Sequence, residues 1–184
     1  MPFAAVSKFL SYVLRHKPED IGLVLDSEGW AEIEKLLTCS NQAGQPLDLI
    51  TLQNIVRESD KKRFTISDDG LKIRAAQGHS TKTVTITHTE KVPPATLFHG
   101  TATQFLESIL RTGLIAGDRH YVHLSQDSKT ASLVGMRHGD VVILKVAASE
   151  MHVQGHMFYQ ADNNVWLIRH VPAEFLYPIP SPSI

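Results

Sequence analysis

The sequence predicts an α+β protein built from two lobes. Three stretches of helical spacing come first, a run of period two follows them, and short strands alternate with helices through the second half. The proline pair Pro93-Pro94 separates the two patterns, and such a change marks a domain boundary. We therefore expect a first lobe at 1–90, a second at 91–178 and a loose C-terminal tail at 179–184.

The first lobe opens with helical patterns. Apolar residues recur at helical spacing across 6–14, and Pro18 lies beyond the end of that helix. The same spacing predicts a second helix near 33–37 and a third at about 49–59. Two leucines within 23–25 predict a short strand between the first two helices.

Two basic residues, Arg15 and His16, come at the C-terminal end of the first helix. The helix dipole favours cations there, which by itself would explain them. The alternative is that the rigid helix end presents them to a phosphate, which arginine grips with two parallel hydrogen bonds. The residues alone leave both interpretations open.

Period two replaces the helical spacing at 63–66 and 71–75, on either side of the turn Asp68-Asp69-Gly70. Asp-Gly between alternating runs is a strong hairpin signal. The side chains expected to face the helices are Phe64, Ile66, Leu71, Ile73 and Ala75. The opposite, polar set is Arg63, Thr65, Lys72 and Arg74. Three helices followed by a hairpin are typical of a winged-helix-like lobe.

The net charge is −1, from 18 basic and 19 acidic residues, which excludes a protein that binds nucleic acid by bulk positive charge. A local excess remains between Lys61 and Lys82, where six basic side chains face two acidic ones and give +4. Such a run is usually a solvated face of a β-ribbon, and a local polyanion site is the alternative.

The single cysteine, Cys39, excludes an internal disulfide framework and a thiolate metal cluster, which fits a reducing compartment. Lys8 interrupts the apolar N-terminal stretch and no cleavage site follows, so we expect no signal peptide. No apolar run reaches the roughly 18 residues that a membrane helix needs. We expect a cytoplasmic protein without membrane contact.

Two short strands of the second lobe, 97–101 and 121–125, end in polar groups that suit a ligand. Gly100, between His99 and Thr101, has no Cβ and would let a flat ligand lie against the backbone, and Thr101 offers a hydroxyl. These features predict a pocket between the two strands. The alternative for His-Gly-Thr is a turn with a satisfied histidine.

Alternation in the second of these strands places Tyr121, His123 and Ser125 on one face, and Val122 and Leu124 on the face that enters a core. One face would then carry two rings and a hydroxyl.

Further elements follow. Gly113 should end a helix that begins after residue 101, and Asp127 should cap a helix that runs through Met136 and leaves Arg137 at its end. Apolar runs predict buried strands at 141–146 and 165–168.

Other chemistries lack a motif. Seven of the ten histidines lie from His99 onward, yet His152 and His156 enclose Gly155, which disfavours the helix that zinc ligands at this spacing need. The sequence contains no Walker loop, no GxGxxG and no recognisable nucleophile motif around Cys39 or a serine. We expect no metal.

Several separated motifs occur in order along the chain: Leu14-Arg15-His16, Lys62-Arg63-Phe64, Gln77-Gly78-His79-Ser80, His99-Gly100-Thr101, Val122-His123-Leu124-Ser125, Gly135-Met136-Arg137 and Asn164-Val165-Trp166-Leu167. Together they resemble the NAD-dependent RNA 2′-phosphotransferases, whose C-terminal lobe is similar to that of ADP-ribosyltransferases. The resemblance covers nearly the whole chain.

The resemblance implies the roles of particular residues. The family's basic catalytic set carries over onto Arg15, His16, Arg63 and Arg137. Its NAD pocket carries over onto His99, Gly100, Thr101, His123 and Ser125. Where other ADP-ribosyltransferases have a catalytic glutamate, this family has an apolar residue, which we assign to Val165. A carboxylate there would repel an anionic nucleophile.

The resemblance also implies the reaction. An internal 2′-phosphate of RNA attacks NAD, the co-substrate, and releases nicotinamide; the linked ADP-ribose then takes the phosphate as ADP-ribose 1″,2″-cyclic phosphate and leaves a 2′-hydroxyl on the RNA. His16 either orients the phosphate or moves a proton. No protein partner is implied. Two alternatives are an ADP-ribosyltransferase for another acceptor and a non-catalytic winged-helix module that binds nucleic acid.

Overall fold

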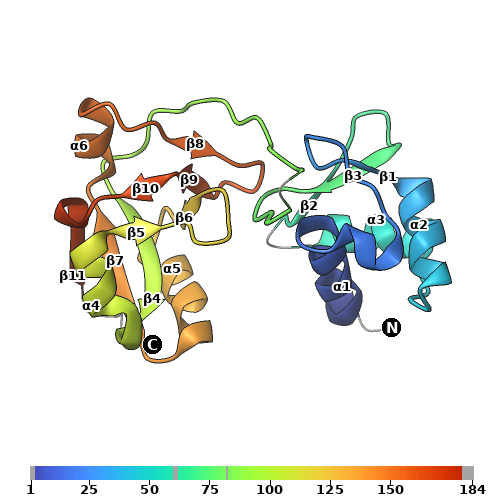
Figure 1. Ribbon diagram of the computed structural model, residues 1–184, viewed down its shortest axis with the longest axis horizontal. Coiled ribbons are helices and arrows are strands. Elements are labelled where there is room, and N and C mark those ends of the chain that lie inside the picture. The colour runs from blue at the N-terminus through green and yellow to red at the C-terminus, as the bar shows by residue number, and fades with distance from the viewer. Residues whose placement is uncertain (1–2, 60–61, 82, 180–184) are drawn as a thin grey trace. The chain divides into compact units, whose positions relative to one another are not determined.

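The computed structural model describes residues 3–59, 62–81 and 83–179, and it divides into two compact units, Met1–Thr87 and His88–Ile184 (Figure 1). The described residues contain six α-helices and several small antiparallel sheets. The α+β class predicted from the sequence is therefore confirmed.

Three α-helices belong to the first unit: α1 (Phe3–Arg15), α2 (Ile33–Gln42) and α3 (Leu49–Glu58). They confirm the three helices expected from the apolar spacing. The start of α3 has a local cause, because the Asp48 side chain accepts a hydrogen bond of 2.7 Å from the Thr51 N–H.

The strand expected at 23–25 is a wrong prediction. A 3₁₀ helix, η1 (Pro18–Ile21), precedes this stretch, and the Leu23 N–H donates to the Pro18 carbonyl at 3.0 Å. The backbone of Leu23 thus closes a helix end instead of joining a sheet, while its side chain is buried in the core. The first strand of the unit is β1 (Ala31–Glu32).

A hairpin completes the first unit. Strands β2 (Phe64–Ile66) and β3 (Lys72–Ala75) pair antiparallel, and β1 adds to β3, so the sheet order is β1-β3-β2. Phe64 is buried as expected, but Leu71 is 65% exposed. Its N–H donates to Asp69 Oδ1 at 2.9 Å, so Leu71 belongs to the turn and not to the alternating strand.

The core of the first unit lies between its helices and the hairpin. Its fully buried large side chains are Leu10, Leu14, Leu36, Leu52 and Ile73. Each side chain of this size stabilises the fold by roughly 1.5–3 kcal/mol on burial.

The second unit contains three small sheets. The first has the order β11-β7-β4, the second β6-β9-β8, and the third is the pair β10-β5. All neighbouring strands are antiparallel. The strands are β4 (Leu97–Ala102), β5 (Leu114–Ile115), β6 (Val122–Leu124), β7 (Val141–Val146), β8 (Tyr159–Gln160), β9 (Trp166–Ile168), β10 (His170–Val171) and β11 (Leu176–Ile179).

Helices α4 (Thr103–Thr112) and α5 (Ser128–Gly135) both pack on β4 and β7 (Figure 1). Gly113 ends α4, and the Asp127 side chain caps α5 by accepting from Thr130 N–H, both as the sequence predicted. The third helix is α6 (Ala148–Val153), followed later by the 3₁₀ helix η3 (Ala173–Phe175).

Two boundary predictions can be compared with the structure. The first unit ends at Thr87, whereas the sequence pattern placed the boundary after residue 90. Ile179 is the last residue of β11, and the remainder of the expected tail, 180–184, lies outside the described residues. Across the part of the chain that is described, no helix is both long and apolar enough to cross a membrane.

Candidate functional site

The predicted residues of the first unit lie at the ends of its elements. Arg15 is the last residue of α1, and His16 follows it with its N–H donating to the Tyr12 carbonyl at 2.9 Å. Arg63 directly precedes β2, and its carbonyl accepts a hydrogen bond of 2.9 Å from the Ala76 N–H. Arg15, His16 and Arg63 are all partly buried, so part of each residue is accessible to solvent.

A segment beyond the hairpin returns to the end of α1. The Ser80 N–H donates to the Arg15 carbonyl at 2.9 Å, and Ser80 Oγ lies 2.9 Å from His16 Nδ1. The sequence motifs included Ser80 but gave it no role. A contact between residues 64 positions apart has no local sequence signal.

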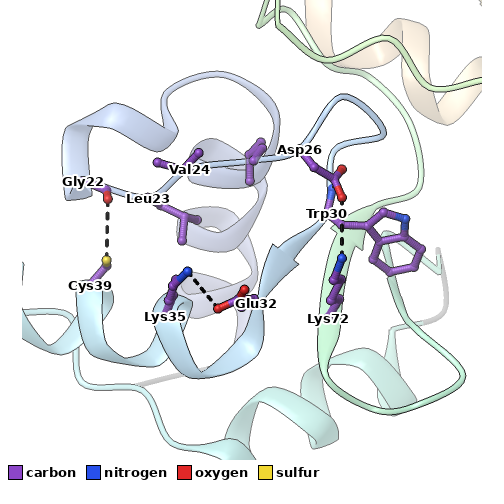
Figure 2. Close-up of a pocket in the computed structure, with 10 residues that line it drawn as sticks. Gly22, Leu23, Val24, Asp26, Trp30, Glu32, Lys35, Cys39 and Lys72 are labelled. Atoms are coloured by element: carbon purple, nitrogen blue, oxygen red, sulfur yellow. Dashed lines mark hydrogen bonds and ion pairs between the residues drawn. The ribbon is translucent and has the colours of Figure 1, made fainter.

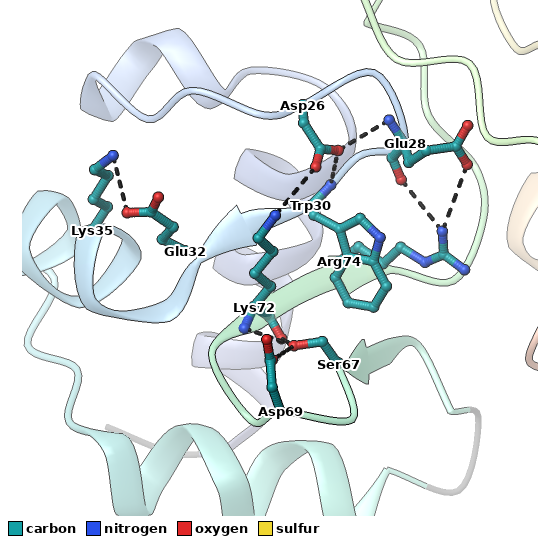
Figure 3. Close-up of polar contacts among 9 residues, drawn as sticks. All are labelled: Asp26, Glu28, Trp30, Glu32, Lys35, Ser67, Asp69, Lys72 and Arg74. Carbon is teal, nitrogen blue, oxygen red and sulfur yellow. Dashed lines mark hydrogen bonds and ion pairs between the residues drawn. The ribbon is translucent and has the colours of Figure 1, made fainter.

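The polar face of the hairpin is partly neutralised by its neighbours (Figure 3). Lys72 lies 3.8 Å from Asp26, and Arg74 lies 3.9 Å from Glu28. The Arg74 guanidinium also stacks over the ring of Trp30, 4.5 Å from its centroid. Lys72 and Arg74 therefore make contacts within the unit. Because these contacts partly neutralise their charges, the two residues add little to a site for a polyanion.

Arg63 differs from Arg74. Among the residues that the structure describes, no carboxylate forms an ion pair with Arg63. Lys61 and Lys82, which also contributed to the expected charge excess, lie outside the described residues. Arg63 is the arginine of this hairpin that suits an external anion.

The Glu28 side chain binds Thr87, the last residue of the first unit. Its carboxylate accepts hydrogen bonds from the Thr87 N–H at 3.0 Å and from Thr87 Oγ1 at 2.8 Å. These hydrogen bonds, with a smaller contribution from the charge of Arg74, lower the pKa of the Glu28 carboxyl below its usual value.

A pocket of about 360 Å³ lies elsewhere in the first unit (Figure 2). Its charged lining residues pair with one another: Lys35 lies 2.9 Å from Glu32, and Lys72 lies 3.8 Å from Asp26. Two lysines and two carboxylates give no net charge that would select a phosphate. None of the predicted site residues lines this pocket.

In the second unit, the two strands that the sequence singled out lie side by side. Phe98 and Ser125 exchange two backbone hydrogen bonds of 2.8 Å, which join β4 to the residue after β6. His99 Nδ1 lies 3.0 Å from the His123 carbonyl oxygen. The structure thus brings together three of the residues predicted to bind NAD: His99, His123 and Ser125.

The neighbours of these two histidines determine their tautomers. A carbonyl oxygen only accepts, so His99 Nδ1 carries a hydrogen and donates it in this contact. Arg119 Nη1 lies 3.3 Å from His123 Nδ1, and arginine only donates, so His123 Nδ1 accepts and Nε2 carries the hydrogen. The two imidazoles therefore differ in which nitrogen donates.

The expected alternation along 121–125 is confirmed. Val122 and Leu124 are buried in the core of the second unit, while Tyr121, His123 and Ser125 are partly exposed. The ring of Tyr121 packs edge-on against two further rings: His88 at 5.7 Å and Tyr159 at 5.6 Å between centroids.

The reason for a glycine at position 100 differs from the one the sequence suggested. A Cβ on Gly100 would lie 1.8 Å from the carbonyl oxygen of Ala131 in α5. A Cβ on Gly135 would in turn lie 3.0 Å from the Gly100 carbonyl carbon and 2.6 Å from Val141 Cγ2. The space that a Cβ would take is filled by a helix, so close packing of α5 on β4 is sufficient to explain the glycine.

Thr101, the next residue, is only 6% exposed. It pairs with Val142, one position before the end of the β4–β7 ladder. The hydroxyl that the sequence analysis offered to a ligand therefore belongs to a residue with little accessible surface.

Arg137 lies in a 3₁₀ turn, η2 (Met136–His138), that continues directly from α5. Its side chain is exposed. The turn with Arg137 continues from α5, and α5 packs against Gly100. Arg137 is therefore held next to the strand that contains His99. The same close packing thus connects the second unit's predicted arginine to its predicted NAD residues.

Val165 directly precedes β9 and is not part of it. Its carbonyl accepts from the Ala161 N–H at 2.9 Å, which closes the β8–β9 turn. Two residues later, Leu167 pairs with both His123 and Tyr159. Directly opposed residues of antiparallel strands share a face of the sheet, so Leu167 shares a face with His123 and Tyr159. Val165 comes two residues before Leu167, next to this face.

Within the described ranges, no group of three or more His, Cys, Asp or Glu side chains is arranged to hold a metal ion.

Comparison with known proteins identifies the family. The model of the RNA 2′-phosphotransferase, Tpt1 / KptA family matches residues 2–170. The chain belongs to this family of RNA 2′-phosphotransferases. It is 58% identical over 173 residues to the RNA 2′-phosphotransferase of Escherichia coli K12, and 58% identical over 173 residues to a probable RNA 2′-phosphotransferase of Shigella boydii; each match covers 94% of both chains.

The family match extends across both units and includes every predicted site residue from Arg15 to Val165. The family that the sequence motifs indicated is therefore confirmed.

Proposed function

We propose that this protein removes an internal 2′-phosphate from RNA by transferring it to NAD. The observation that carries the proposal is the join between β4 and β6, which holds His99, His123 and Ser125 together in one place. Two imidazoles of defined tautomer beside a hydroxyl suit a polar, ring-bearing substrate such as the nicotinamide riboside of NAD. The basic residues Arg15, His16, Arg63 and Arg137 are the matching set for a phosphate.

In the proposed first step, a 2′-phosphate oxygen of the RNA forms a bond to the ribose carbon that bears nicotinamide, and nicotinamide leaves with the bonding pair. In the second, the neighbouring ribose 2″-hydroxyl attacks phosphorus. The RNA 2′-oxygen leaves and gains the proton that the hydroxyl loses, giving 2′-hydroxyl RNA and ADP-ribose 1″,2″-cyclic phosphate.

Fixed guanidinium groups are the right residue type for these steps. Both steps place negative charge on phosphate oxygens, and arginine binds two such oxygens with parallel, charge-assisted hydrogen bonds. Arg15 and Arg63 would bind the RNA phosphate, and Arg137 would act from the second unit. We propose that the arginines replace a metal ion in this role, so that exhaustive EDTA treatment leaves turnover unchanged.

The lobe architecture follows the same proposal. Three helices packed on a hairpin fit a winged-helix-like lobe that presents RNA phosphate. Two small sheets joined at Phe98 and Ser125 fit an ADP-ribosyltransferase-like lobe that binds NAD. Val165, next to the sheet face that carries His123, would occupy the position at which other ADP-ribosyltransferases have a glutamate.

The deciding experiment incubates the protein with NAD and a short RNA that carries or lacks one internal 2′-phosphate. We expect nicotinamide, 2′-hydroxyl RNA and the cyclic phosphate product only when NAD and the 2′-phosphate are both present. Nicotinamide release with another acceptor would instead indicate a different ADP-ribosyltransferase. Binding of RNA without any turnover would indicate a binding module.

A further inference from the structure

The end of α1 is capped by residues that are distant in the sequence. The last carbonyls of a helix have no partner within the helix. The Arg15 carbonyl accepts from the Ser80 N–H at 2.9 Å and from Thr81 Oγ1 at 3.4 Å. The segment that contains Ser80 is thereby attached to the backbone just before His16.

The same segment is anchored on its other side. His79 is 4% exposed, and a Cβ on Gly29 would lie 2.9 Å from His79 Nε2 and 3.1 Å from Val84 Cγ1. Downstream, the Thr85 N–H donates to the Ser27 carbonyl at 2.7 Å. Ser80 therefore lies between two fixed points, and its hydroxyl has a defined position.

That hydroxyl is directed at one atom of a predicted catalytic side chain. Ser80 Oγ lies 2.9 Å from His16 Nδ1, and both residues are partly buried. The two ring nitrogens of histidine are chemically distinct, and the partner of one determines which tautomer and which ring orientation the other presents.

We propose that Ser80 is a positioning residue for His16: its hydroxyl binds Nδ1 and thereby orients Nε2 toward the 2′-phosphate of the RNA. The inference rests on the proposed function, which places His16 at that phosphate. It assigns the catalytic contact to Nε2 and gives Ser80 a role that acts through His16.

The kinetic test compares Ser80→Ala, Ser80→Thr, His16→Ala and the double variant Ser80→Ala/His16→Ala with the wild type. Ser80→Ala should lower kcat about tenfold, the rate equivalent of one hydrogen bond, and leave the KM for NAD unchanged. Ser80→Thr keeps the hydroxyl and should restore most of the loss. In the His16→Ala background, Ser80→Ala should have no further effect.

Ser11→Ala is the matched control for the loss of a serine hydroxyl. Ser11 also lies in this unit, is partly buried, and donates to the Ser7 carbonyl at 2.8 Å. Its hydroxyl bonds to the backbone of α1 and not to a predicted site residue, so its removal should leave kcat unchanged. An equal loss of kcat for Ser80→Ala with and without His16 would overturn the proposal.

The second measurement does not depend on turnover. Nitrogen-15 NMR of the imidazoles, with the His16 signals assigned by their loss in His16→Gln, should show one tautomer in the wild type and averaged tautomers in Ser80→Ala. A short oligonucleotide with an internal 2′-phosphate should shift Nε2 of His16 more than Nδ1. Unchanged His16 signals in Ser80→Ala, or a larger shift at Nδ1, would overturn the proposal.

The two measurements separate this inference from the proposed function. If the wild type fails to transfer the phosphate to NAD, the proposed function is wrong, and the nitrogen spectra still decide whether Ser80 orients His16.

Discussion

The two units hold their predicted site residues by different means. In the second unit, His99 and His123 meet because the backbones of Phe98 and Ser125 exchange hydrogen bonds. In the first, a side-chain contact reaches the His16 ring from Ser80, 64 positions further along the chain. Backbone pairing survives most substitutions, whereas a side-chain contact disappears with one atom.

Each unit is therefore sensitive to a different kind of substitution. The second unit depends on the close approach of main chains, which the side chain of one residue can block. In the first unit, the orientation of the His16 ring depends on the identity of the side chain at position 80. Substitutions of both kinds test this contrast.

Gly100→Ala should have the largest effect, because the new Cβ would lie 1.8 Å from the Ala131 carbonyl oxygen and force α5 away from β4. We expect a loss of about 5 kcal/mol in unfolding free energy or failure of the second unit to fold. Denaturant unfolding measures it. Gly117→Ala is the control, since its Cβ would meet nothing within 4 Å at φ +62°, and it should cost only about 1–2 kcal/mol. Equal losses would refute the close-packing account.

Val165→Glu should lower the rate of phosphate transfer more than the stability of the fold. It tests whether the residue before β9 lies next to the reacting phosphate. At ~4 Å and an effective dielectric of about 20, a carboxylate would oppose the incoming phosphate by on the order of 4 kcal/mol, about a thousandfold in rate. Hydrolysis of NAD by neutral water should suffer far less.

The measurement for Val165→Glu is the ratio of 2′-phosphate transfer to nicotinamide release without RNA, with folding checked by circular dichroism. Val165→Gln is the matched neutral control and should keep most of the transfer. Undiminished transfer in a folded Val165→Glu protein would show that position 165 is not beside the phosphate.

Arg63→Ala and His99→Ala should separate the two units by substrate. Loss of a charge-assisted, two-pronged contact should weaken RNA phosphate binding by about a hundredfold in Arg63→Ala, with NAD affinity nearly unchanged. His99→Ala should weaken NAD binding instead. Arg63→Lys should rescue only in part, because an ammonium cannot reproduce the planar fork.

Calorimetry with NAD and with 2′-phosphorylated RNA tests both variants. Arg57→Ala, at an exposed arginine of the same unit, is the control and should change neither affinity. If Arg63→Ala and His99→Ala lose NAD affinity equally, the assignment of Arg63 to the phosphate is wrong.

The smallest effect is expected at Glu28, whose folded-state pKa is lowered by its hydrogen bonds from Thr87. A lowered pKa stabilises the folded state above the ordinary value of 4.5, and the contribution is lost as the pH falls through the folded pKa. The change should stay under about 1 kcal/mol, because the side chain is 38% exposed and screened by solvent.

Unfolding free energies of the wild type and Glu28→Gln at neutral and acidic pH test this linkage. The difference between the two proteins should shrink on acidification. A difference that grows toward acidic pH would contradict the sign of the pKa shift.

Most local elements of this fold can be predicted from the order of the amino acids. The existence of α1 and α3, the strand Val141–Val146 and the hairpin around Asp69 follow from apolar periodicity and turn residues. These patterns are complete within a short window of the chain, so no knowledge of distant residues is needed. The ordered motifs likewise indicated the family that comparison then confirmed.

Which atoms meet depends on contacts between segments that are distant in the chain. The exposure of Leu71, the helix beside Gly100 and the contact of Ser80 with His16 each depend on residues outside the local window. Residue type predicted that His99 and His123 belong to one site, but the pairing of Phe98 with Ser125 supplies the reason. Periodicity states which side of an element is buried; the partner that covers it, and therefore each residue's physical role, is determined by packing between segments far apart in the chain.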